Sequence, residues 1–169
     1  MKPQLPRDTT RLTFRWWHED DTPIARALWG DPKVVALLGE VKANERLEAE
    51  LALADEHGVQ YWPIFLRDGG EHVGACGLRP KAEGVLELGY HLKPERWHQG
   101  FADEASRSVI AHAFSALKVD CLFAGHHPDN AASGRTLLRL GFRYTHDELF
   151  EATGLRHPSY ELRPRFHDS

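Results

Sequence analysis

A glycine turn that feeds directly into a helix is the strongest chemical signal in this chain. The turn, Gln99-Gly100-Phe101-Ala102, follows a strand-like run at residues 85–92 and opens an amphipathic segment. Gly100 lets the backbone approach a ligand closely, and the first N–H groups of a helix have no partner inside the helix. Such groups, together with the positive end of the helix dipole, bind anions and most often a phosphate. The turn therefore predicts a phosphate site, and a plain glycine in a strand-to-helix turn is the alternative.

The residues around this turn argue against two common nucleotide sites. The turn lacks the Lys-Ser or Lys-Thr pair of a P-loop and a full Gly-x-Gly-x-x-Gly. A second segment carries polar residues at a predicted helix start, Asn130-Ala-Ala-Ser133, and that helix ends in Leu140-Gly-Phe142. Asn and Ser are both good helix-capping residues, so a structural role and a ligand contact are compatible there.

Composition sets the class of protein. The 169 residues fit one domain, residues 1–169 with a core at about 10–163, and this length is enough for a full hydrophobic core. A net charge of −4 argues against a dedicated nucleic-acid binder. No apolar stretch reaches membrane-spanning length and residues 1–6 lack the apolar core of a signal peptide, so we expect a cytoplasmic protein without a membrane partner. Cys76 and Cys121 lie in apolar stretches and are expected to be buried thiols.

The hydrophobic periodicity predicts a mixed chain in the order β-α-α-β-β-β-α-β-α-β-β. Strands are predicted near residues 10–16, 61–66, 72–78, 85–92, 121–124, 142–145 and 160–163, and helices near 23–29, 43–57, 102–117 and 130–140. The third helix has apolar residues at offsets 0, 3, 7, 8, 11, 12 and 15 from Ala102, which is one face of an amphipathic helix. The two polar segments described above therefore lie at the starts of the third and fourth helices.

This order of elements and the glycine turn resemble the GNAT superfamily of acyl-CoA-dependent N-acyltransferases. The phosphate signature of that superfamily is Arg/Gln-x-x-Gly-x-Gly/Ala; Gly100 and Ala102 match its last two fixed positions, and Trp97 departs from the first. Within the superfamily the chain is most similar to the branch that includes the Rim-type ribosomal-protein N-terminal acetyltransferases. The matching segments are an opening at residues 10–15, the strand Glu87-Leu-Gly-Tyr90, the turn with His98 in place of its first glycine, Asn130 with Ser133, and Leu140-Gly-Phe142.

The resemblance implies the GNAT fold, an α+β (mixed α/β) arrangement. Its central, mostly antiparallel twisted sheet is splayed between the fourth and fifth strands and flanked by about four helices. It also implies acetyl-CoA as co-substrate, with the pyrophosphate on the N–H groups of residues 99–103 and the pantetheine arm paired with residues 85–92 as an added strand. The residues expected to contact the cofactor are Leu88, Tyr90, Leu92, Trp97, His98, Gln99, Gly100, Phe101, Ala102, Asp103, Asn130 and Ser133.

An amine must be neutral to attack the thioester, so a base is useful. Glu87 is the first candidate, because it is a lone carboxylate in an apolar strand and partial burial would make it a stronger base. In related enzymes a Glu on this strand often acts directly or through water, and a solvated or ion-paired structural Glu is the alternative. His91 shares a strand face with Glu87 and could orient a water or the substrate. His126 and His127 follow the next strand, and adjacent residues in a strand point apart, so no shared metal site is expected.

The leaving thiolate benefits from a proton donor or a hydrogen bond. Many GNAT members place a Tyr seven residues after the Asn, and here that position is Leu137. Rim-like members instead offer the Ser of Asn-x-x-Ser to the sulfur, which maps onto Ser133, while Asn130 would bond the pantetheine or its carrier backbone. The resemblance thus implies Ser133 as a third catalytic candidate beside Glu87 and His91.

The expected acceptor is a primary amine of a protein N-terminus or of a small molecule. Residues 146–151 are acidic and, with residues 19–21, could attract a cationic amine, although an ordinary solvated loop is the alternative. Monomer and homodimer both remain open. Two rival hypotheses stand beside the enzyme: a non-catalytic acyl-CoA-binding sensor or interaction module, and a protein in which His98 fills the phosphate site so that no CoA binds.

Overall fold

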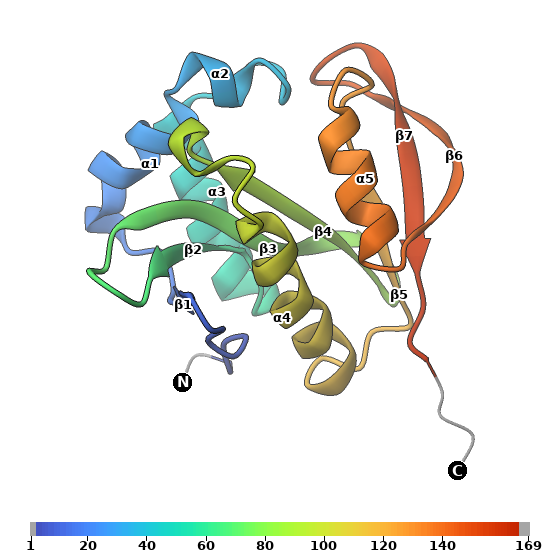
Figure 1. Cartoon of the computed structure of the whole chain (residues 1–169), viewed down its shortest axis with the longest axis horizontal. Coiled ribbons are helices and arrows are strands. Elements are labelled where there is room, and N and C mark those ends of the chain that lie inside the picture. The colour runs from blue at the N-terminus through green and yellow to red at the C-terminus, as the bar shows by residue number, and fades with distance from the viewer. Residues whose placement is uncertain (1–2, 166–169) are drawn as a thin grey trace.

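A seven-stranded sheet organises the protein, and helices cover both of its faces (Figure 1). The computed structural model describes residues 3–165. The strand order is β1-β2-β3-β4-β5-β7-β6, and β4–β5 is the parallel pair within this otherwise antiparallel sheet. The strands are β1 (Leu12–Phe14), β2 (Tyr61–Leu66), β3 (His72–Ala82), β4 (Val85–Leu92), β5 (Cys121–Gly125), β6 (Arg143–Phe150) and β7 (Leu155–Leu162). The predicted fold class, a mostly antiparallel mixed sheet with flanking helices, is confirmed.

The predicted helices are all present, with one addition. The helices are α1 (Thr22–Trp29), α2 (Pro32–Val35), α3 (Ala43–His57), α4 (Phe101–Ser115) and α5 (Ala131–Arg139). The additional helix, α2, is a single turn that starts at Pro32 behind the capping carboxylate of Asp31. The sequence pattern missed it because four residues are too few to show a helical period.

The two faces of the sheet carry separate clusters of buried side chains. Helix α4 packs on one face, where Ala105, Val109 and Ala113 are fully buried against strand residues. Helices α1 and α3 cover the other face, where Trp17 and Trp29 form a second cluster that includes Tyr61. Both cysteines are buried free thiols, as predicted.

Strands β4 and β5 part soon after they meet. Their pairing covers three positions, Val85 with Cys121, Leu86 with Leu122 and Glu87 with Phe123. Residues 88–92 remain paired to β3 on their other side. The backbone groups of residues 88–92 that face away from β3 therefore form an edge inside the sheet, which is the splay predicted from the resemblance.

The last hairpin is longer than predicted. Strand β6 runs over Arg143–Phe150 and takes up most of the acidic stretch at 146–151, which lay outside the strand predicted near 142–145. Most of its residues are exposed, because it is the outer strand of the sheet. Without a buried face it lacks the alternation of apolar and polar residues by which strands are recognised. In residues 3–165 no helix has the length and apolar character needed to cross a membrane.

Candidate active site

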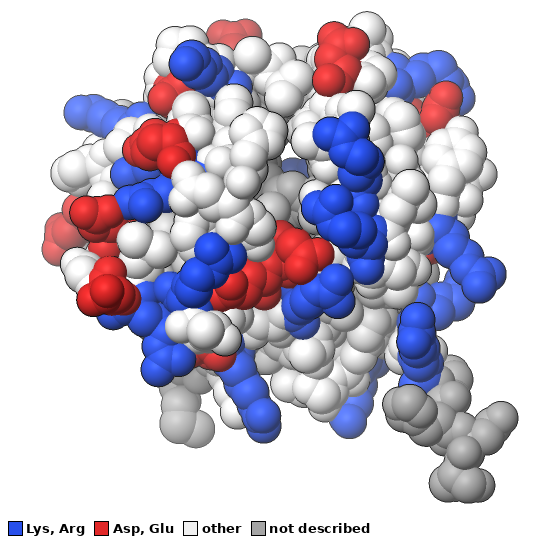
Figure 2. Space-filling model, in the orientation of Figure 1, with Lys and Arg blue, Asp and Glu red and all other residues white. Residues whose placement is uncertain are grey.

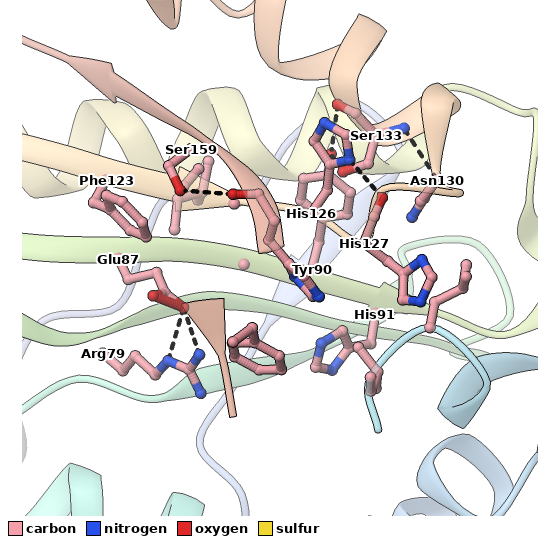
Figure 3. A pocket seen from close by; sticks show the side chains of 18 of the residues that line it. Arg79, Glu87, Tyr90, His91, Phe123, His126, His127, Asn130, Ser133 and Ser159 are labelled. Atoms are coloured by element: carbon pink, nitrogen blue, oxygen red, sulfur yellow. Dashed lines mark hydrogen bonds and ion pairs between the residues drawn. The ribbon is translucent and has the colours of Figure 1, made fainter. Parts of the chain in front are cut away.

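A cavity of about 500 Å³ opens where β4 and β5 diverge. Its walls come from these two strands, the start of α5, the β6–β7 hairpin and the segment between α2 and α3. Six of the predicted site residues line it: Glu87, Leu88, Tyr90, His91, Asn130 and Ser133. In Figure 3, Glu87 lies on the other side of the cleft from Ser133 and Asn130, with Tyr90 between them. Predicted residues from two parts of the sequence, β4 and the start of α5, thus meet at one cavity.

Glu87 is ion-paired within this cavity. Arg79 lies directly opposite it in the β3–β4 register and donates to its Oε1 from Nε at 2.9 Å and from Nη2 at 2.5 Å. The guanidinium presents both N–H groups in a fixed planar fork, which holds this oxygen in place. Oε2 receives no hydrogen bond from the part of the chain that the structure describes. The carboxylate is therefore held in one orientation with one oxygen left to accept a proton or a water.

His91 is held as a neutral imidazole. Trp29 donates from its indole nitrogen to Nδ1 of His91 at 3.0 Å, so the ring proton is on Nε2. Burial lowers the pKa of His91 well below its ordinary value, and the charges of Arg46 and Arg79 lower it further. His91 can donate a hydrogen bond from Nε2 to a water or substrate, but its Nδ1 is already occupied.

Ser133 and Asn130 sit at the start of α5, where the helix opens onto the cavity. The side-chain oxygen of Asn130 accepts a hydrogen bond from the backbone N–H of Ser133 at 3.2 Å, which is a helix cap. The hydroxyl of Ser133 lies 2.7 Å from the hydroxyl of Tyr90 on β4. Leu137, one turn further along α5, also lines the cavity with an apolar side chain.

The glycine turn precedes α4 in the predicted manner. Gly100 is the residue before the helix and has φ +79°, a left-handed conformation that glycine adopts without strain. His98 also has a positive φ, +60°. This is the position where the Rim-like pattern has a glycine, so the histidine here adopts a conformation that is uncommon for a residue with a side chain. Its ring is exposed.

The turn offers backbone donors and is braced from the N-terminal segment. In the described chain, no acceptor pairs with the N–H groups of residues 99–103, while the N–H of Glu104 already bonds to the carbonyl of Gly100. Arg11 braces the turn, because it donates to the carbonyl of Gln99 at 3.0 Å and bonds Glu104 at 2.7 Å. Trp97 donates from its ring to the carbonyl of Leu92 at 2.9 Å and so ties the turn to β4.

Basic side chains lie beside the cleft, on α5 and α4. Figure 2 shows a column of Lys and Arg side chains over the position of α5, next to the hollow between the two halves of the molecule. Arg135 and Arg139 are exposed on α5, and Arg107 on α4 reaches the carbonyl of Arg139 at 3.4 Å. A chain with a net charge of −4 therefore carries a local positive surface suited to a polyphosphate.

Other predicted residues are placed less directly. The side chains of Leu88 and Leu92 point into the core and are buried. These two residues therefore contribute only their backbone groups to the inner edge of β4. Phe101 is buried under the guanidinium of Arg11, 4.1 Å from the ring centre, and Ala102 packs against the same core. Asp103 pairs with Arg107 at 2.9 Å.

Sequence reasoning missed Arg79 and His157, and it did not foresee that His126 and His127, which it expected to point apart, both line the cavity. His126 accepts a hydrogen bond from Tyr160 at Nε2, 3.1 Å away, because its Nδ1 lies 2.8 Å from a carbonyl oxygen. His127 and His157 line the same cavity with their rings 5.5 Å apart. No three potential ligands gather closely enough to hold a metal ion among the residues described. Only the register of β3 against β4, and of β5 against β7, would have revealed these neighbours.

Comparison with known proteins names the family. The family model described as "Acetyltransferase (GNAT) domain" matches residues 11–143, most of the chain. The chain belongs to the GNAT acetyltransferase family. It is thus an acetyl-CoA-dependent N-acetyltransferase, and the family decides against the non-catalytic acyl-CoA-binding module. The match spans the glycine turn and the cavity, where the free N–H groups and the inner edge of β4 suit a phosphorylated, extended co-substrate.

Relatives of this GNAT enzyme agree with the assignment. It is 30% identical over 145 residues to the uncharacterized N-acetyltransferase YoaA of Bacillus subtilis, covering 80% of this chain and 81% of the relative. The uncharacterized N-acetyltransferase p20 of Bacillus licheniformis is 27% identical over 143 residues, 80% of each chain. The fold matches that of RimL, a ribosomal L7/L12 alpha-N-protein acetyltransferase solved with coenzyme A, with a TM-score of 0.80, 15% identity and coverage of 95% and 98%. The solved neighbours thus include the Rim type, as the resemblance implied.

Proposed function

We propose that this GNAT enzyme transfers the acetyl group of acetyl-CoA to the primary amine of a protein N-terminus or of a small molecule, by direct attack of the amine on the thioester. The observation that carries the proposal is the single cavity that Glu87 and Ser133 line from opposite sides, where β4 and β5 part. A carboxylate and a hydroxyl across one cleft can serve the two proton-sensitive ends of acyl transfer, the attacking nitrogen and the leaving sulfur.

The co-substrate would enter from the glycine turn. The N–H groups of residues 99–103 would bind the pyrophosphate, with Arg135 and Arg139 adding positive charge nearby. The pantetheine would pair with the inner edge of β4 at residues 88–92. Asn130 would bond the pantetheine through its amide nitrogen, since its oxygen already caps α5.

The residues of the cavity would divide the chemistry between them. Glu87 would accept the proton of the attacking amine at Oε2, directly or through a water, while Arg79 fixes Oε1. His91 would donate from Nε2 to orient that water or the acceptor. Ser133 would donate a hydrogen bond to the sulfur as the carbon–sulfur bond breaks. This division gives Glu87, His91 and Ser133 one task each.

A protein N-terminus is the acceptor favoured by the fold neighbours. RimL is described as an alpha-N-protein acetyltransferase, and another neighbour, at TM-score 0.81 and 20% identity, as a putative ribosomal-protein-serine acetyltransferase from Vibrio cholerae. The cavity also supports an α-amino group on physical grounds. An α-amine has a pKa of about 8, against about 10.4 for lysine, so a larger fraction of the former is neutral at pH 7 and less help from a base is needed.

The test is thiol release from acetyl-CoA across N-terminal peptides, lysine peptides, polyamines and small amines. We expect acceptor-dependent release that is fastest with N-terminal peptides or small α-amines and is lost in Glu87→Gln. Calorimetry with acetyl-CoA on the same sample separates a missing acceptor from a missing site. Failure of the wild-type protein to bind acetyl-CoA would overturn the placement of the co-substrate. That result would support the alternative in which His98 fills the phosphate site.

A further inference from the structure

Tyr90 and Ser133 form a hydroxyl pair at the centre of the cleft. Their oxygens are 2.7 Å apart, although the residues are 43 positions apart in the sequence. Tyr90 comes from β4 and Ser133 from the first turn of α5, the helix that follows β5, so the pair connects β4 to that helix across the splay. Both residues line the cavity, and Figure 3 shows Tyr90 between Glu87 and Ser133. The Tyr90 ring packs against the core, while its hydroxyl and that of Ser133 are polar partners of one another.

The chemistry of the two hydroxyls sets the direction of this hydrogen bond. Either hydroxyl can donate in this geometry, and we assign Tyr90 as the donor because a phenol is the stronger donor of the two and its oxygen is the poorer acceptor. The backbone carbonyl of Ser133 is a more distant alternative at 3.4 Å. A hydroxyl that accepts one bond still has its own hydrogen to donate. Among the described residues, Ser133 Oγ has no further partner, so that hydrogen is available to the cavity.

We infer that Tyr90 is a positioning residue for acetyl transfer, which directs the hydroxyl hydrogen of Ser133 toward the sulfur of the thioester. The inference rests on the proposed function, since it assumes that the sulfur reaches Ser133. It deepens that proposal by naming what orients Ser133. Leu137, the neighbouring side chain of α5 in the cavity, is apolar and offers no competing hydrogen bond.

The reaction balances without a proton leaving Tyr90. The amine nitrogen forms a bond to the acetyl carbon, the carbon–sulfur bond breaks, and its electron pair stays on sulfur. Glu87 or a water takes the proton lost by nitrogen, and solvent protonates the sulfur when CoA departs. Ser133 stabilises the thiolate only by a hydrogen bond. Burial raises the pKa of Tyr90 to about 12, while an ordinary thiol has a pKa of about 8.5. A thiolate is thus too weak a base to take the phenol proton.

The first experiment needs no acceptor. The thiol of bound CoA is titrated by its rate of alkylation with iodoacetamide against pH, with the alkylated CoA counted by mass spectrometry. We expect Ser133→Ala to raise the thiol pKa of bound CoA by about 1 and Tyr90→Phe to raise it by about half as much. Tyr144→Phe is the matched control, because its hydroxyl bonds Asp147 on the exposed strand β6. The control should leave the thiol pKa unchanged.

The second experiment uses the best acceptor of the panel and measures coupling between the two residues. We expect kcat to fall about fivefold in Tyr90→Phe and about twentyfold in Ser133→Ala, with KM for acetyl-CoA within about twofold of wild type. The double variant should be no slower than Ser133→Ala, since Tyr90 acts only through Ser133.

Three results decide the inference. Losses that multiply in the double variant, or a Tyr90→Phe enzyme with wild-type kcat and an unchanged thiol pKa, would overturn it. A Tyr90→Phe protein that melts below the assay temperature, so that the fraction of unfolded protein accounts for its whole loss of kcat, would mark Tyr90 as merely structural. That result would also overturn the inference. Loss of CoA binding by the wild-type protein would overturn the proposed function itself, which calorimetry distinguishes from the other outcomes.

Discussion

Arg79 donates two hydrogen bonds to the same oxygen of Glu87, from Nε at 2.9 Å and from Nη2 at 2.5 Å. This pairing leaves the second carboxylate oxygen without a hydrogen bond from the described residues and fixes the side chain in the wall of the cleft. Glu87 therefore differs from the lone carboxylate that its apolar strand predicted. The ion-paired alternative is present, and it is compatible with a role in proton transfer through the free oxygen.

Replacing this carboxylate should slow the reaction without unfolding the protein. We expect Glu87→Gln to lower kcat/KM by about a hundredfold, because a positioned general base contributes about that much. The amide can still accept a hydrogen bond from Arg79, so the melting temperature should move little. The measurement is thiol release with the fastest acceptor of the panel.

The control for this prediction is Glu148→Gln. Glu148 pairs with Lys81 at 2.7 Å on the rim of the same cavity, so it tests for a general effect of charge. We expect its kcat/KM to remain within about threefold of wild type, as for a solvent-exposed ion pair. Equal losses in the two variants would refute a specific role for Glu87.

Side chains at Gly100 should block acetyl-CoA. The left-handed backbone of Gly100 tolerates Asn but strains a β-branched residue by about 1–2 kcal/mol. We expect both Gly100→Asn and Gly100→Val to weaken acetyl-CoA binding by at least about tenfold, because either side chain crowds the turn amides. Only the Val variant should lose several degrees of melting temperature. Calorimetry and thermal melts distinguish the two effects, and a Gly100→Asn protein with wild-type affinity would move the phosphate site elsewhere.

Gly89 should tolerate no side chain. A Cβ at this position would lie 2.6 Å from Cε2 of Tyr61 and closer still to Cζ and Oη. Tyr61 is buried and cannot retreat, so Gly89→Ala should lower the free energy of unfolding by about 1–3 kcal/mol. Adding Tyr61→Phe should not restore stability, since the ring carbons remain in place, whereas Tyr61→Leu should restore part of it. Urea unfolding of the three proteins provides the measurement.

Acid should destabilise the fold through His72. Burial, with a smaller effect of the charge on Lys93, lowers the pKa of His72 to about 4 from an ordinary value of 6.5. The unfolded chain binds the proton first as pH falls, so stability is fully present above about 6.5 and is lost progressively down to about 4. We expect wild type to lose about 2 kcal/mol more than His72→Phe between pH 7 and pH 5. Equal losses in urea unfolding would count against this assignment.

The parts of the fold that local sequence controls were predicted well. The glycine turn and α4 follow from Gly100 and from an apolar face repeated over four turns, and both signals lie within one segment. The capping by Asn130 is equally local. These elements placed the polar segments correctly at the starts of two helices.

Contacts between segments could not be predicted in the same way. Arg79 meets Glu87 only because β3 and β4 pair in one register, and a register shift follows just after it, between Pro80 and Ala82. Tyr90 meets Ser133 only because α5 is carried across the splay by β5. The exposed strand β6 carried no alternating pattern because nothing packs on most of its residues. Where two residues become neighbours only through tertiary pairing, their spacing in the sequence does not predict the contact.

The three-residue pairing between β4 and β5 has a consequence for the lifetime of the protein. Beyond Glu87 the inner edge of β4 has no neighbouring strand, so a pantetheine arm seated there acts as a removable eighth strand. A ligand that binds only the folded state raises stability with the logarithm of its concentration. The supply of CoA and acetyl-CoA would then set how long each molecule survives proteolysis, and a cell short of the donor would clear the idle enzyme faster than the working one.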